Sequence, residues 1–119
     1  LARIAVVNGG PSDAEGLYKR AIDLEPNWVY PNMNLASHYV RGKRYDLALP
    51  YGERAAQLAP DKPVAHYRLA FIYEQLERLP EARQQLQAVL EAQERNPSSE
   101  VKPDQVRAEI AALDAKLPR

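Results

Sequence analysis

The sequence predicts an all-α fold made of stacked helix–turn–helix repeats, on two observations: internal repetition with a period of about 34 residues and helical spacing inside each repeat. A single unit of this kind cannot bury its apolar faces alone, and stacking buries them. The residues that match from one repeat to the next are mostly apolar or proline: Pro26 and Pro60, Leu35 and Leu69, Ala36 and Ala70, and Tyr39 and Tyr73.

Each repeat is expected to hold two helices joined by a tight turn. Ala48 and Ala55 lie seven residues apart, on one face of a second helix. The polar residues 41–44 precede that helix, and they include Gly42, which is able to adopt a positive φ. The expected helices lie near residues 1–8, 12–25, 30–41, 45–58, 63–77, 81–95 and 102–117.

Helix boundaries carry their own signals. Residues 12–15 (Ser-Asp-Ala-Glu) form a capping box, and prolines punctuate the junction at 60–63. Pro50 conflicts with this pattern, because it lies about one turn inside an expected helix and lacks the N–H that the helix needs. We expect a slight bend or a late helix start there.

The repeated residues resemble the tetratricopeptide repeat family, whose pattern has large and small residues at fixed places in a unit of about 34 residues. The middle repeat has Leu35, Ala36 and Tyr39, then Ala48, Ala55 and Pro60. The next has Leu69, Ala70 and Tyr73, then Ala82 and Leu86. The sequence departs from the family at its tryptophan (Asn32 and His66), at a large residue of the second helix (Gly52) and at a closing proline (Glu94).

The resemblance implies a right-handed superhelix with a C-terminal capping helix. We expect repeats over residues 1–95, with a truncated first repeat (1–26), a second (29–60) and a third (63–95). Residues 96–119 form a linker and an amphipathic helix. Because the sequence begins without methionine, we interpret it as a piece of a longer protein.

The last helix has an apolar face made by Val106, Ile110, Leu113 and Leu117. One interpretation is a cap that covers the last repeat with a polar outer surface. The other is a detachable helix that docks into a groove of this chain or of a neighbour.

The resemblance also implies that the first helix of each repeat lines a concave groove that binds a peptide or helix. The candidate groove residues are Tyr30, Met33, Asn34, Ser37, Arg41, Val64, Tyr67, Arg68 and Phe71. Several are apolar and, with Val6, Val7 and Val40, they form a second apolar face on these helices. Either this face binds a partner or neighbouring helices bury it.

Some members of the family grip a terminal carboxylate with lysine, asparagine and arginine. Asn34 and Arg68 match two of those places. Val64 stands where lysine is expected and Arg3 where asparagine is expected, so two of five places match, with the first lying before the sequence.

Composition argues against other classes of function. Acidic and basic residues balance at 16 each and are interspersed, which disfavours nucleic acid and anionic membranes. The chain has no cysteine, and no apolar run long enough to span a bilayer. His38 and His66 lack acidic neighbours at ligand spacing, so we interpret both as structural. We expect no cofactor, no metal and no enzyme activity in this segment, and the compartment stays open between cytoplasm and periplasm.

Two alternatives remain open. The first is a structural or self-associating segment, in which an exposed terminal helix with Leu1, Ile4 and Ala5 pairs with another copy. The second is a repeat segment fused to a catalytic domain elsewhere in a larger protein.

Overall fold

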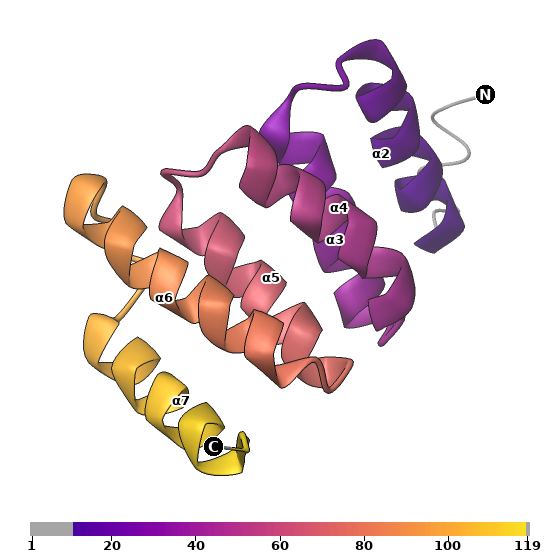
Figure 1. Ribbon diagram of the computed structural model, residues 1–119. Helices are drawn as coiled ribbons and strands as arrows, with labels where there is room; N and C mark the ends of the chain where they lie inside the picture. Colours follow the sequence, from indigo (N-terminus) through magenta and orange to yellow (C-terminus); the bar gives the residue numbers. More distant parts are fainter. Residues whose placement is uncertain (1–10, 119) are drawn as a thin grey trace. The chain divides into compact units, whose positions relative to one another are not determined.

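The computed structural model describes residues 11–118, with side chains from residue 14 onward. Within this range the chain forms six α-helices and no strand (Figure 1). The expected all-α fold of helix–turn–helix repeats is therefore confirmed. The helix expected near residues 1–8 and the side chain of the capping-box serine lie outside the described part.

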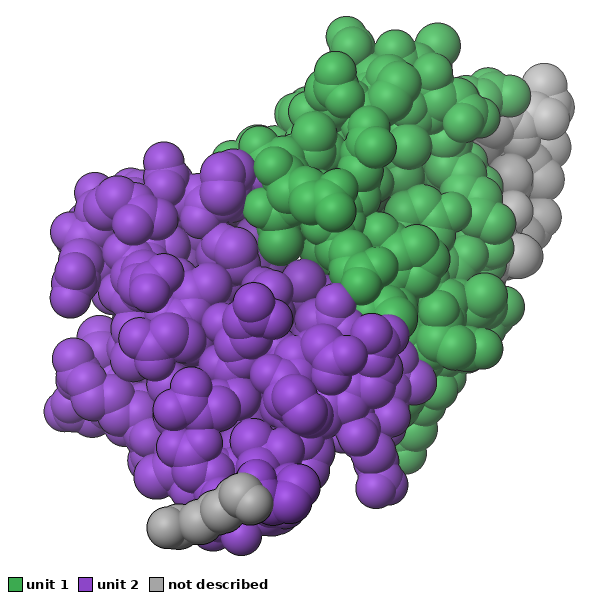
Figure 2. Space-filling view, in the orientation of Figure 1, with its two compact units in different colours: residues 1–58 green, residues 59–119 purple. Residues whose placement is uncertain are grey.

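The chain divides into two units, residues 1–58 and 59–119 (Figure 2). The first unit contains α2 (Pro11–Leu24), α3 (Val29–Arg41) and α4 (Tyr45–Leu58), and α3 packs against both others. Buried alanines allow helices to approach closely, while larger side chains fill the space between them. The buried apolar residues of α3 and α4 are Met33, Leu35, Ala36, Tyr39, Ala48, Ala55 and Ala56.

Tyr39 also connects α3 to α2. Its hydroxyl donates a hydrogen bond to Oε2 of Glu15 at 2.8 Å, and Lys19 Nζ lies 2.9 Å from the same oxygen. The hydrogen bonds from Lys19 and Tyr39, together with the positive charges of Lys19 and Arg44, hold the pKa of Glu15 below its ordinary value. Sequence spacing inside one repeat gives no indication of this link.

The second unit contains α5 (Pro63–Gln75), α6 (Leu79–Arg95) and α7 (Pro103–Lys116), and α6 packs against both others. The buried apolar residues of α5 and α6 are Ala65, Leu69, Ala70, Ile72, Tyr73, Ala82, Leu86, Val89 and Ala92. α6 is 17 residues long and runs past the place where the family pattern ends a helix. Its last residue, Arg95, forms an ion pair with Asp61 (Nε to Oδ1, 3.0 Å), which fixes this end of α6 to the start of the unit.

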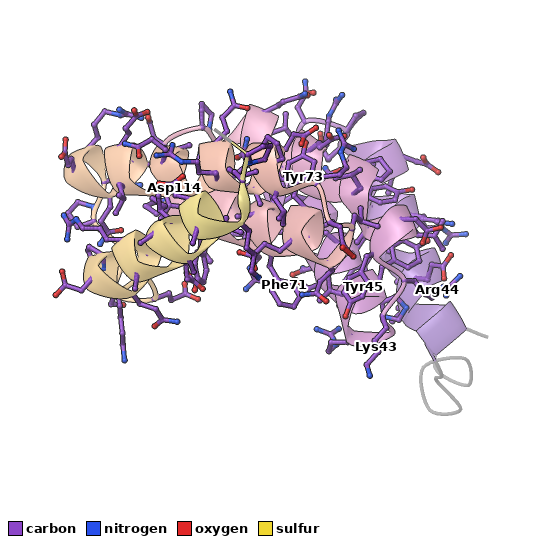
Figure 3. All side chains as sticks on the ribbon, turned by 60° about the horizontal axis from the view of Figure 1, so that its bottom comes forward. Lys43, Arg44, Tyr45, Phe71, Tyr73 and Asp114 are labelled. Carbon is purple, nitrogen blue, oxygen red and sulfur yellow. The ribbon has the colours of Figure 1, made fainter. Side chains whose placement is uncertain are left out.

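α7 caps α6, as the first interpretation of the C-terminal segment expected. It buries Val106, Ile110 and Leu113, and burial of each such side chain is worth about 1.5–3 kcal/mol. Asp114 of α7, labelled in Figure 3, forms an ion pair with Arg83 of α6. The apolar face and the ion pair together hold α7 on its own unit.

The turns inside the helix pairs α3–α4 and α5–α6 have the same backbone hydrogen bonds. In the α3–α4 turn, the N–H of Arg44 donates to Tyr39 O (2.8 Å) and that of Lys43 to Val40 O (2.9 Å). The α5–α6 turn has both bonds at the corresponding places of the next repeat, from Arg78 to Tyr73 (2.9 Å) and from Glu77 to Glu74 (3.0 Å). In each turn the arginine guanidinium also lies over the tyrosine ring, 5.2 and 5.0 Å from its centroid.

Gly42 does not use its capacity for a positive φ. Gly42 has φ −89°, and Lys43 adopts the left-handed conformation at φ 59°, as Glu77 does in the second turn. The hydrogen bonds that close the turn require a left-handed conformation at the residue after the C-cap. Gly42 is itself the C-cap of α3, so the left-handed conformation falls on Lys43. A lysine and a glutamate therefore occupy a conformation that glycine adopts at lower cost.

Of the two outcomes expected at Pro50, a slight bend or a late helix start, the late start is not observed. α4 begins at Tyr45 and continues through Pro50. The proline removes the hydrogen bond to the carbonyl of Asp46, and both residues are exposed. Water can therefore satisfy that carbonyl, so the helix need not start later.

Candidate functional site

The candidate residues of α3 are mostly polar and lie toward solvent. Tyr30 is 51% exposed, Asn34 and Arg41 are exposed, and Ser37 is half-buried. α3 contains no acidic residue. Its exposed surface therefore offers an aromatic ring, an amide and a guanidinium.

Met33 differs from its neighbours on α3, because only 8% of it is exposed. α3 has packed neighbours on two sides, α2 and α4. A helix between two neighbours buries an arc wider than one face. For Met33 the structure thus supports the alternative of burial, and its thioether belongs to the core.

The candidate residues of α5 form a more aromatic surface. Phe71 is 44% exposed, and Figure 3 labels it on α5. Tyr67 and Val64 are half-buried one and two turns before it, and Arg68 is exposed beside them. Because residues three and four apart share a helix face, Val64, Tyr67 and Phe71 form one continuous strip on α5.

α7 completes this surface. The Tyr67 hydroxyl donates to both carboxylate oxygens of Glu109, at 3.1 and 3.0 Å, and Gln105 Nε2 donates to that hydroxyl at 3.4 Å. Burial and the bond to Glu109 raise the pKa of Tyr67 to about 12. Tyr67 therefore stays protonated at neutral pH and orients the carboxylate of Glu109.

A second carboxylate, Glu74, lies on the same face of α5, three residues after Phe71. Its pKa is raised first by partial burial and then by the negative charge of Glu109, while Lys116 lowers it. The two carboxylates are thus close enough to repel each other. We call Tyr67, Phe71, Glu74 and Glu109 the α5–α7 face.

The carboxylate-gripping pattern has little support in the described residues. Asn34 and Arg68 are both exposed, Val64 is a half-buried apolar residue, and Arg3 lies outside the described part. Besides Arg68, the second unit presents the carboxylates of Glu74 and Glu109, whose negative charges would repel a terminal carboxylate.

Both histidines have structural partners. His66 Nδ1 lies 2.8 Å from Gln85 Oε1, and its Nε2 lies 2.7 Å from Pro60 O. The ring of His38 packs near those of Tyr18 and Tyr39, with centroids 6.4 and 5.8 Å away. Among the described residues, no three histidine or acidic side chains are grouped so that they could hold a metal ion. None of the helices within residues 11–118 has the length and apolar character needed to cross a membrane.

The candidate residues predicted from the sequence include neither Glu74 nor Glu109. Pro97 lies one repeat after Pro63, the first residue of α5, but α7 begins only at Pro103, because α6 is long. A comparison at the repeat period therefore cannot align α7 with the earlier first helices. The signal that was available is the position of Glu109 directly beside Ile110, at the edge of the apolar face of α7.

Models of the tetratricopeptide repeat match two overlapping stretches, residues 1–63 and 39–102. Each covers more than half of the chain. No curated protein matches it.

Several solved structures share the fold. The type III secretion chaperone SycD of Yersinia enterocolitica, in complex with a peptide of the translocator YopD, has a TM-score of 0.80 at 20% identity over 97% of this chain and 88% of its own. The first repeat domain of Spaghetti, bound to an HSP90 peptide, has a TM-score of 0.74 at 22% identity over 97% and 86%. The Sgt2 repeat domain of Aspergillus fumigatus has a TM-score of 0.72 at 22% identity over 97% and 73%.

Proposed function

Because the chain belongs to the tetratricopeptide repeat family, we propose that it is a protein-interaction module that binds a peptide or helix of a partner protein. The proposed contact surfaces are the exposed residues of α3 and α5. Each helix offers its surface within its own unit.

The observation that carries this proposal is the surface of α5. This helix already buries Leu69, Ile72 and Tyr73 in its unit, yet Phe71 is 44% exposed between them in sequence. An exposed aromatic side chain beside polar groups is typical of residues that anchor a partner. Tyr30, 51% exposed on α3, is the corresponding aromatic of the first unit.

Two similar structures support a peptide as the ligand, since they contain a translocator peptide and an HSP90 peptide. Balanced charge, with 16 acidic and 16 basic residues, supports a protein partner over nucleic acid. The proposed role is binding, and it assigns no catalytic group to this segment. The repeat boundaries at 1–26, 29–60 and 63–95 are part of the same proposal.

The test is a screen of the whole chain against an unbiased array of 12-residue peptides, followed by fluorescence anisotropy on the peptides retained. Phe71→Ala and Tyr30→Ala are expected to weaken binding, each by about 1–2 kcal/mol, or roughly five- to thirtyfold in Kd. Leu47→Ala is the matched control, because Leu47 is 40% exposed but lies on α4.

The proposal fails if no peptide in the array binds, or if Leu47→Ala weakens binding as much as the two aromatic variants do. Circular dichroism would confirm that all three variants remain helical.

Self-association is the second candidate, and one observation favours it. Leu17 and Leu24 lie seven residues apart on α2 and are 51% and 74% exposed. Two exposed leucines on one helix face are typical of a surface that another chain covers. Light scattering across a concentration series would detect association, and Leu17→Ser with Leu24→Ser should abolish it.

A further inference from the structure

The α5–α7 face combines an exposed ring with two carboxylates. Tyr67, Phe71 and Glu74 follow one another at four and three residues along α5, so they share one side of the helix. The hydrogen bonds from Tyr67 bring Glu109 of α7 to this side. Apolar and negatively charged groups thus meet within the second unit.

The α5–α7 face carries the carboxylates of Glu74 and Glu109, while Lys116 acts on Glu74 and Arg68 is exposed next to Tyr67 in sequence. A tyrosine hydroxyl orients Glu109 without neutralising it. Partial burial, and then the negative charge of Glu109, raise the pKa of Glu74, while the positive charge of Lys116 lowers it. A positively charged ligand beside Glu74 would favour the ionised form of this carboxylate.

Phe71 gives this face an apolar component. A lysine or arginine of a partner has an aliphatic stem that can pack on an aromatic ring while its charged end reaches a carboxylate. Glu74 lies one turn beyond Phe71, at the spacing that such a long side chain spans. A free carboxylate, by contrast, would be repelled by Glu74 and Glu109.

We propose that the α5–α7 face binds a peptide segment that presents a basic side chain next to an apolar one. The basic side chain pairs with Glu74 and Glu109, and the apolar one packs on Phe71 and Tyr67. This inference rests on the proposed peptide-binding function and specifies its ligand.

The experiment uses 12-residue peptides that carry leucine and arginine as neighbours in a glycine–serine background. Both ends are blocked, so that terminal charges play no part. Matched peptides replace arginine with glutamine or glutamate. Kd is measured by fluorescence anisotropy with the whole chain at low and physiological salt.

We expect the arginine peptide to bind about tenfold more tightly than the glutamine peptide, and the difference to shrink with salt. The double variant Glu74→Gln, Glu109→Gln should lose this preference. The control variant Glu91→Gln, Glu94→Gln changes the net charge equally on exposed residues of α6 and should keep it. The first variant is expected to fold, because it removes a repulsion.

The outcomes separate this inference from the general function. If array peptides bind but show no preference for arginine, the inference is wrong and the binding function stands. If the preference survives in Glu74→Gln, Glu109→Gln, the site is wrong. If no peptide of any charge binds, both proposals fall. If Phe71→Ala instead abolishes a concentration-dependent increase in mass, the face is an interface between copies and the inference is overturned.

Discussion

The helix pairs α3–α4 and α5–α6 are alike in their turns and different in their surfaces. Both turns contain the same two backbone hydrogen bonds, a residue in the left-handed conformation (Lys43 or Glu77), and an arginine guanidinium over a tyrosine ring. On their exposed sides, α3 has no acidic residue, whereas α5 carries Glu74 next to Phe71. The tyrosine hydroxyls also donate hydrogen bonds to different neighbours. Tyr39 donates to Glu15 of α2, which precedes it in the chain, and Tyr67 donates to Glu109 of α7, which follows it.

This difference teaches which features a repeat must keep. The turn and the packed face are fixed by hydrogen-bond geometry and close packing, so they recur in both pairs. The outer face has no such constraint, so its chemistry can change from one repeat to the next. Binding specificity can therefore lie in one unit without disturbing the fold of the other.

The strongest test of equivalence addresses the cores. Leu35 is 0% and Leu69 is 2% exposed, at the same place in their repeats. Leu35→Ala and Leu69→Ala should each cost about 2–5 kcal/mol, from lost burial and from the cavity left behind. Urea unfolding measures both. A loss below about 1 kcal/mol for either variant would contradict the equivalence of the two cores.

A smaller effect is expected from the tyrosine hydroxyls. Tyr67→Phe keeps the ring and removes the bond to Glu109, which should cost about 1 kcal/mol at this partly exposed place. The pKa of Tyr67 is raised from 10.0 to about 12, so folding favours its neutral form. Its contribution is complete below pH 10 and is lost as the pH rises toward 12.

The stability difference between the wild type and Tyr67→Phe should therefore narrow between pH 10 and pH 12. Urea unfolding at pH 8 and pH 11 measures it, and Tyr39→Phe provides the comparison in the first unit. The pKa of Tyr39 is raised as well, by burial and by Glu15, so its difference should narrow in the same direction. If the stability difference between the wild type and Tyr67→Phe is equal at both pH values, the hydrogen bond from Tyr67 to Glu109 does not contribute to stability and the prediction is wrong.

The turns should give the smallest effects. A Cβ on Gly42 would lie 3.6 Å from Tyr39 O and 3.7 Å from Arg44 Cδ, which is ordinary contact. Gly42→Ala should therefore stabilise the chain by about 0.4–1 kcal/mol. Lys43→Gly should relieve the left-handed residue and gain about 0.5 kcal/mol after its own entropy cost.

The second turn supplies the controls for that comparison. Glu77→Gly should stabilise as Lys43→Gly does, because both residues have φ 59°. Leu76→Gly should destabilise by about 0.5–1 kcal/mol, since Leu76 holds the place of Gly42 with an ordinary φ of −90°. Thermal melting resolves the four signs. Opposite signs for Lys43→Gly and Glu77→Gly would mean that the turns are not equivalent.

Much of the fold was predictable from the sequence, because the 34-residue repeat and the helical spacing inside it indicate the same buried positions. The match of Leu35 to Leu69 and of Tyr39 to Tyr73 places the packed faces, and prolines mark the junctions. The left-handed residue was not predictable from composition. The position of the left-handed residue depends on which carbonyls at the end of the helix accept hydrogen bonds from the turn. A shift of one residue in these hydrogen bonds moves the left-handed conformation from Gly42 to Lys43.

The candidate site was less predictable than the fold. Phe71 and Tyr67 follow from their spacing on α5, outside the buried positions. Met33 could not be placed in the core without knowing that α3 has neighbours on two sides. Glu109 depends on how far α6 extends before the chain returns, and no local pattern sets that length.

The positions of His38 and His66 have a practical consequence. The chain contains two histidines, one on α3 and one on α5, so each unit carries a single imidazole. In a proton–nitrogen NMR spectrum these rings would give two separate sets of signals without any labelling of specific sites. The signal of His66 would report the contact with Gln85 and that of His38 the contact with Tyr18. Heating one sample would then show directly whether the two units lose their structure at the same temperature.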